Sequence, residues 1–147
     1  MNRELRNRVS AIAKEVRAWA EKIEAKGEFP DMGLCGWCGI CAAELYARLK
    51  LVGILSEIHV STDSGSHAYT VVDDHIVDVT ATQFCNRDGQ TLVIIHSKEA
   101  EHLWYYQTSE IFSTATKFRA WQLNQRWPKR QTAFSRVQTK PKELLTA

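Results

Sequence analysis

The sequence has no long apolar run and few glycines, prolines or cysteines. Its longest uncharged apolar runs, such as Leu92–Ile95, fall far short of the roughly 20 residues that a membrane span requires. Only 7 glycines and 3 prolines occur among 147 residues, which excludes a collagen-like chain. Charged residues and no apolar block follow Met1, so we expect no secretory signal and a cytoplasmic protein. There the 4 cysteines are expected to be thiols, metal ligands or catalysts, and not disulfides.

The length fits one ordinary domain, and the charge is unevenly distributed along it. Hydrophobic residues make up 44% of the chain and charged residues 24%, which allows a sizeable core. From Lys117 onwards 8 bases face 1 acid, whereas the preceding residues hold 11 bases and 16 acids. We expect one domain over residues 1–128 and a basic tail over residues 129–147. The tail could bind nucleic acid or an acidic partner, or be a solvated helix face and a frayed terminus.

Apolar residues at helical spacing predict three helices. The first is about 20 residues long, is stopped by Gly27, and has the stripe Leu5, Val9, Ile12, Val16, Trp19 and Ile23. The second is expected from Cys38 to Val52, with Gly53 as its stop. The third is expected to end before Pro128 and to share a face among Ile111, Ala115, Phe118 and Trp121 or Gln122.

Short β-branched segments between turn-forming residues predict strands in the middle of the chain. They are Ile54–Ser61, Ala68–Val72, Ile76–Thr80 and Thr91–His96. Short connections between the middle strands favour antiparallel pairing. Helices first, a meander next and a helix last predict an α+β domain.

The segment Cys35-Gly-Trp-Cys38-Gly-Ile-Cys41 allows four interpretations. Its spacing is similar to part of a ferredoxin loop, but Leu45 stands where the next cysteine would be. The part from Trp37 to Cys41 resembles the thioredoxin motif, although a loop and no strand precedes it. A third interpretation is three small thiols buried at a helix start, with Cys41 pointing into the core.

The fourth interpretation makes Cys38 a nucleophile. It would lie in the first turn of a helix, where N–H groups and the helix dipole favour a thiolate. Gly36 and Gly39 leave room for a substrate backbone. Such a cysteine needs a base, and that base needs an orienting group.

His67 and Asp78 are the best candidates for the base and its orienting group. If Asp73 and Asp74 form a two-residue hairpin turn, the two side chains become diagonal neighbours on one face of the sheet. The carboxylate would then fix the imidazole tautomer and stabilise its charged form. A three-residue turn would place them on opposite faces. His59 is a rival, because its strand could also present it to a cleft.

Cys38, His67 and Asp78, in this order, resemble the papain-like/transglutaminase-like superfamily of cysteine enzymes, and most closely its small bacterial and phage-encoded members. A glycine fifteen positions after the nucleophile is matched by Gly53. A strand histidine is then followed by an Asp-x-Thr-Ala-x-Gln-Phe segment, matched by Val77-Asp78-Val-Thr-Ala-Thr-Gln-Phe84. The match spans about residues 33–84.

The resemblance implies a catalytic-type domain in which Cys38 attacks an amide carbonyl, His67 transfers the proton and Asp78 orients His67. The acyl group of the resulting acyl-enzyme would pass to water or to an amine, as in peptidases, deamidases and transglutaminases. Trp37 is expected either to form a wall of the cleft or only to pack against its neighbours. Gln83 is expected either to donate a hydrogen bond to the oxyanion or to hold a loop in place. A protein or peptide substrate and no cofactor or metal are expected. The alternatives are a non-catalytic papain-like binding module with a basic tail, and a thiol-redox or metal-binding protein.

Overall fold

The computed structural model describes residues 1–27, 34, 36–62, 67–83 and 90–124. Its elements are α1 (Arg3–Glu24), α2 (Cys38–Leu51), β1 (Glu57–Ser61), β2 (His67–Val72), β3 (His75–Asp78), the 3₁₀ turn η1 (Ala81–Gln83), β4 (Val93–His96), the 3₁₀ turn η3 (Trp104–Tyr106), β5 (Glu110–Phe112) and α3 (Ala115–Asn124). The predictions for Cys35 and for the basic tail lie outside the described residues.

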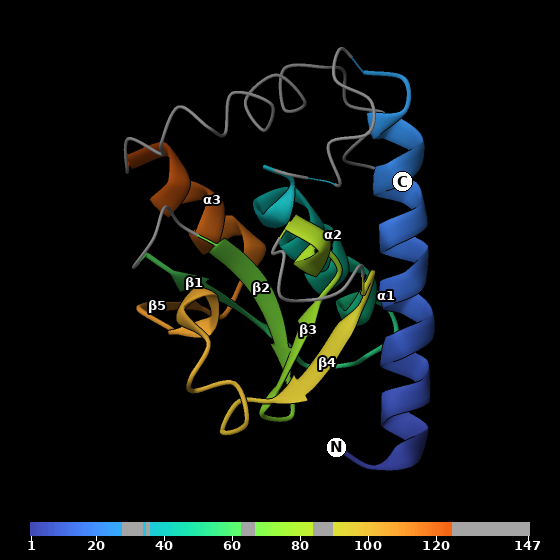
Figure 1. Cartoon of the computed structure of the whole chain (residues 1–147), viewed down its shortest axis with the longest axis vertical. Helices are drawn as coiled ribbons and strands as arrows, with labels where there is room; N and C mark the ends of the chain where they lie inside the picture. Colours follow the sequence, from blue (N-terminus) through green and yellow to red (C-terminus); the bar gives the residue numbers. More distant parts are fainter. Residues whose placement is uncertain (28–33, 35, 63–66, 84–89, 125–147) are drawn as a thin grey trace.

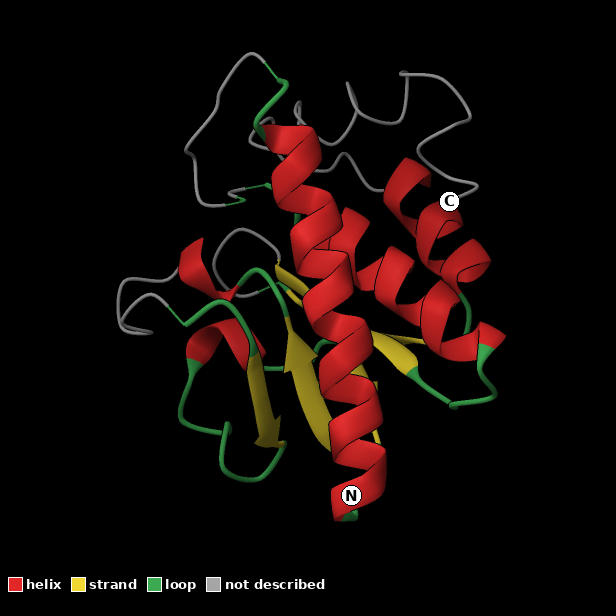
Figure 2. Cartoon of the chain, turned by 90° about the vertical axis from the view of Figure 1, so that its right-hand side faces the viewer, coloured by secondary structure: helices red, strands yellow, loops and turns green. Residues whose placement is uncertain are grey.

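The described chain is an α+β structure, as predicted. Two N-terminal helices precede a five-stranded antiparallel sheet, and a C-terminal helix follows it (Figure 1). Helix α1 runs across the front of the sheet in the second view (Figure 2). Within the described residues, no helix is both long enough and apolar enough to cross a membrane.

Helix α1 follows the predicted apolar stripe. Asn2 caps its start, since its Oδ1 accepts the N–H of Leu5 at 2.8 Å. The buried side of α1 packs on α2 through one core cluster, which includes its residues Val9, Ala13, Val16 and Ala20. Burial of this stripe holds α1 against α2. One part of α1 therefore lies next to the site described below.

Helix α2 begins at Cys38, as predicted, and is stopped by Gly53. The N–H of Gly53 donates to the carbonyl of Lys50 at 3.0 Å, and the N–H of Ile54 donates to the carbonyl of Leu49 at 2.9 Å. Gly53 has φ +75°, a conformation that costs glycine little and other residues more. The predicted C-terminal stop is therefore confirmed.

The sheet has the strand order β4-β3-β2-β1-β5. Between β2 and β3 lies a two-residue turn in which Asp73 and Asp74 have φ of 48° and 57°. Two consecutive positive φ values belong to the turn type that matches the twist of a hairpin. Thr70 pairs with Val77, which is the register that this turn predicts.

Alternate residues of β2 face opposite sides of the sheet. Ala68 and Thr70 face α2, and Thr70 Oγ1 donates to the carbonyl of Ala42 at 3.1 Å. Tyr69 faces the other side, where it packs with Tyr106 of η3. His67 is the first residue of β2, and its ring lies 5.7 Å from that of Tyr69.

The helix predicted from Ile111 onwards is wrong at its start. Ile111 belongs to β5 and pairs with His59 of β1. Helix α3 begins after Thr114, whose Oγ1 accepts the N–H of Lys117 at 3.1 Å as an N-cap. The segment before this cap pairs with the edge of β1. This long-range pairing outweighs the helical spacing of the apolar residues in the segment.

Candidate active site

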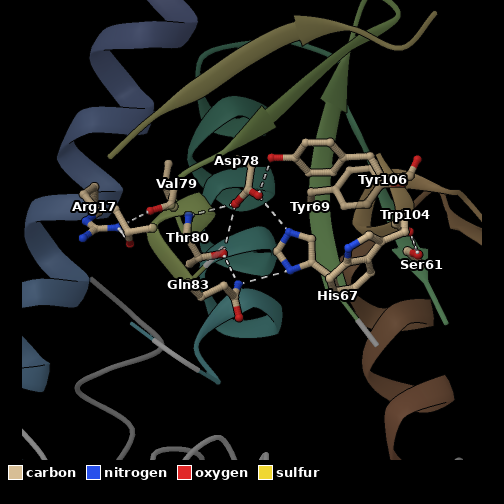
Figure 3. Close-up of polar contacts among 11 residues, drawn as sticks. Arg17, Ser61, His67, Tyr69, Asp78, Val79, Thr80, Gln83, Trp104 and Tyr106 are labelled. Atoms are coloured by element: carbon tan, nitrogen blue, oxygen red, sulfur yellow. Dashed lines mark hydrogen bonds and ion pairs between the residues drawn. The ribbon is translucent and has the colours of Figure 1, made fainter. Parts of the chain in front are cut away.

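His67 and Asp78 form a buried pair. His67 opens β2 and Asp78 ends β3, and the register of these strands brings both side chains to one face of the sheet. The Nε2–H of His67 donates to Asp78 Oδ2 at 2.8 Å (Figure 3), and the side chains are 4% and 2% exposed. The contact predicted from a two-residue turn is confirmed.

Asp78 accepts four hydrogen bonds, two on each oxygen. Besides the His67 ring, Oδ2 accepts the hydroxyl of Tyr106 at 2.8 Å. The other oxygen, Oδ1, accepts the N–H of Thr80 at 2.8 Å and its hydroxyl at 3.0 Å. A carboxylate has about four acceptor directions, so the network uses its full capacity and favours its ionised form.

Cys38 lies beside His67 at the first residue of α2. Its sulfur lies close enough to the imidazole to contribute to the raised pKa of His67. Because Asp78 engages Nε2, the ring nitrogen that can face the sulfur is Nδ1, which the Gln83 amide also approaches. Cys38 is 2% exposed, so the structure encloses the sulfur between α2 and the sheet.

The charges of the pair reinforce each other. Burial alone would lower the pKa of His67, but Asp78, with a smaller contribution from Cys38, outweighs it and raises the pKa to about 10. Burial would raise the pKa of Asp78, but His67, Thr80 and Tyr106 hold it below its ordinary value. At neutral pH the pair is therefore an imidazolium and a carboxylate, with the positive ring next to Cys38.

Cys41 lies one turn further along α2 and is 1% exposed. Its N–H donates to the carbonyl of Trp37 at 2.9 Å, inside the helix. Burial, and then the charges of Cys38 and Asp78, raise the pKa of Cys41 well above its ordinary value. Cys41 therefore stays a neutral thiol, and its predicted inward orientation is confirmed.

The two residues with weaker predicted roles occupy different surroundings. Trp37 is buried and packs edge-on against Trp19, with 6.4 Å between ring centroids, which fits the packing interpretation. The Nε2 of Gln83 lies 3.3 Å from Nδ1 of His67 and donates to Thr80 Oγ1 at 3.2 Å. These contacts fit the loop-holding interpretation, and an oxyanion role for Gln83 stays a prediction.

Two residues that support the site were not predicted from the sequence. Tyr106 bonds Asp78 from η3, and the run of three aromatic residues in which it stands was the only signal for it. Arg17 of α1 donates to the carbonyl of Val79 at 2.8 Å and to Thr82 Oγ1 at 2.9 Å (Figure 3). The contact with Val79 spans 62 residues and holds the segment after Asp78 against α1.

His59, the rival base, is engaged elsewhere. Its Nε2 lies 3.0 Å from Glu57 Oε2, and its Nδ1 lies 3.2 Å from Thr108 Oγ1. Glu57 is exposed, so this pair does not share the buried surroundings of His67 and Asp78. The structure thus brings His67 and not His59 to Cys38.

A small space lies between α2 and the two strands of the pair. Its lining includes Cys38, Cys41, Asp78 and Thr80, and it is closed to a molecule the size of water.

Comparisons of the chain with protein-family models, with curated proteins and with solved structures gave no match. In the part of the chain that the structure describes, no group of three or more His, Cys, Asp or Glu side chains is placed to hold a metal ion. The geometry of Cys38, His67 and Asp78 is therefore the basis on which a function can be assigned.

Proposed function

We propose that the chain is a thiol-dependent hydrolase or acyltransferase that acts on amide bonds in a protein or peptide. Cys38 is the nucleophile, His67 the general base and Asp78 the residue that orients His67. In this proposal the fold is a papain-like/transglutaminase-like core, with the nucleophile helix α2 packed on the antiparallel sheet. The proposed site of action is the cytoplasm.

One observation carries the proposal: a buried carboxylate holds a histidine next to a cysteine in the first turn of a helix. Burying an ion pair is costly unless its geometry is good, and stability alone gives a weak reason to keep one. The first helical turn favours a thiolate, and so does a neighbouring imidazolium. A nucleophile, a base and an orienting group are thus joined in one chain of contacts.

The proposed reaction begins from an ion pair in which the proton of the Cys38 thiol already resides on Nδ1 of His67, so that a thiolate faces an imidazolium. The sulfur attacks the carbonyl carbon, and the carbonyl oxygen takes the negative charge. The backbone N–H of Cys38, at the open end of α2, is placed to stabilise that charge. His67 then protonates the leaving amine as the C–N bond breaks. Water or a second amine then gives a proton to the neutral His67 and takes the acyl group from sulfur, which restores the thiolate and the imidazolium.

Acyl transfer from p-nitrophenyl acetate tests the proposal without a known substrate. The small activated ester should acetylate Cys38 and release one p-nitrophenolate per protein in a burst. Mass spectrometry of peptides locates the acetyl group. Cys38→Ala should slow the burst by at least about 10³-fold, because the bond-forming atom is gone.

Cys41→Ala is the matched control, since it removes a thiol of equal burial from the same helix. This variant should retain the burst and the acetyl group on Cys38. A burst that survives Cys38→Ala, or an acetyl group on Cys41, contradicts the proposal. Disulfide exchange between Cys38 and Cys41 without acylation would instead identify a thiol-redox protein, and an inert Cys38 would favour a binding module.

A further inference from the structure

Tyr106 contributes a fourth side chain to the group formed by Cys38, His67 and Asp78. Its hydroxyl donates to Asp78 Oδ2 at 2.8 Å, which is the same oxygen and the same distance as the bond from His67 (Figure 3). Its ring centroid lies 5.8 Å from that of His67. Tyr106 comes from η3, outside the segment that carries the family resemblance.

The position of Tyr106 is itself fixed by neighbouring groups. Tyr69 is placed to donate to the backbone carbonyl of Tyr106 at 3.1 Å and lies 2.8 Å from Thr108 Oγ1. The rings of Tyr69 and Tyr106 meet edge to face, with 5.1 Å between centroids. The hydroxyl of Tyr106 is therefore held against the carboxylate from the side of the sheet opposite to α2.

We propose that Tyr106 is a positioning residue that shares Asp78 Oδ2 with His67, and so sets both the orientation of the imidazole and its readiness to give up a proton. The inference rests on the proposed function of the site. Two donors on one oxygen hold the carboxylate at a fixed angle to the ring. The hydroxyl also places its positive end at the oxygen that faces His67, which weakens the attraction between Asp78 and the imidazolium.

This effect gives Tyr106 a role that packing alone would not. A base must return its proton to the leaving group, so an imidazolium that is held too strongly is a poor acid. Among the described residues, the titratable side chains that face His67 are Cys38 of α2, Tyr69 of β2, Asp78 of β3, and Tyr105 and Tyr106 of η3. The hydroxyl of Tyr106 moderates the charge of Asp78 within this group.

The test is Tyr106→Phe, which keeps the ring and removes the hydroxyl. The ring signals of His67 are followed by nuclear magnetic resonance as a function of pH. We expect the titration of His67 to move to higher pH by about 0.5 to 1 unit, since a hydrogen bond to a charged group is being removed. The alkaline limb of the acetylation rate with p-nitrophenyl acetate should move in the same direction.

Tyr105→Phe is the matched control. Tyr105 is the neighbour of Tyr106 in η3, its ring lies 6.5 Å from that of His67, and its hydroxyl is not among the donors to Asp78. It should leave the His67 titration close to that of the wild type. Equal shifts in the two variants, or no shift in Tyr106→Phe, would overturn the proposal.

The titration needs no substrate, so it separates this inference from the proposed function. If the His67 titration shifts in Tyr106→Phe but the wild-type protein is not acetylated at Cys38, the role of the Tyr106–Asp78 contact is supported and the proposed enzymatic function is contradicted. If Tyr106→Phe does not fold, hydroxyl exchange in the wild type decides the matter. A slowly exchanging Tyr106 hydroxyl proton supports the proposal, and a rapidly exchanging one contradicts it.

Discussion

Cys38 and Cys41 lie one turn apart on α2 and are equally buried, at 2% and 1% exposure, yet their surroundings differ. Cys38 is the first residue of the helix and contacts His67. Cys41 lies within the hydrogen-bonded helix, and burial is the main reason that its pKa is raised. The two thiols lie on the same helix, line the same space and are enclosed to the same degree, so exposure alone does not distinguish them.

Cys38 differs from Cys41 in two respects: an imidazolium lies beside it, and it stands at the start of the helix. His67 carries a positive charge at neutral pH, because Asp78 and Cys38 raise its pKa to about 10 against the opposing effect of burial. A thiolate next to that charge is stabilised, and the first-turn N–H groups of α2 act in the same direction. Cys41 receives the opposite influence, since Cys38 and Asp78 both raise its pKa.

The largest expected effect follows from removing the imidazolium. In His67→Ala, the rate of Cys38 alkylation by iodoacetamide at neutral pH should fall by about 10²-fold or more, because the sulfur loses its base and its counter-charge. The rate at Cys41 should stay unchanged, so the contrast between the two thiols should disappear. Mass spectrometry of alkylated peptides measures both rates in one sample.

His59→Ala is the control for that variant. It removes a histidine from the neighbouring strand that is bonded to the exposed Glu57. The alkylation of Cys38 should remain as fast as in the wild type. An equal loss in His59→Ala and His67→Ala would mean that a change in folding, and not the ring beside the sulfur, controls the rate.

A smaller effect is expected on the pH dependence of stability. The pKa of His67 is raised on folding, so its contribution is complete below about pH 6.5 and is lost as the pH rises towards about 10. The pKa of Asp78 is lowered, so its contribution is present above about pH 4 and is lost as the pH falls through the folded value. The free energy of unfolding should therefore be highest between about pH 4 and about pH 6.5 and should fall by about 3 kcal/mol towards pH 9.

Urea unfolding at a series of pH values measures this profile. Asp78→Asn should flatten it on the alkaline side, because the imidazolium loses its counter-charge. Asp74→Asn, in the hairpin turn, should keep the wild-type shape. Stability that rises from about pH 6.5 to about pH 9 would contradict the assignment of a charged His67.

Much of the site could be predicted because it depends on local rules. The turn at Asp73 and Asp74 fixes the hairpin register, and the register fixes the contact of His67 with Asp78. Glycine at position 53 and the apolar pattern before it define α2, and so place Cys38 at a helix start.

The parts that were missed depend on contacts between distant segments. Ile111 was assigned to a helix because nothing in its neighbourhood shows that β1 has a free edge. Arg17 and Tyr106 reach the site from α1 and η3, and helical or strand periodicity carries no information on such contacts. The enclosure of Cys38 also arises from the packing of distant elements, which the sequence pattern does not report.

The most direct measurement is the pH profile of iodoacetamide labelling at Cys38 and Cys41 in the wild-type protein. If His67 holds Cys38 as its charged partner, Cys38 should label quickly well below about pH 8, and Cys41 should label slowly throughout. Slow labelling of Cys38 that reaches half its maximum near about pH 8.5, as for an ordinary thiol, would contradict a catalytic pair. Faster labelling of Cys41 than of Cys38 would contradict it as well.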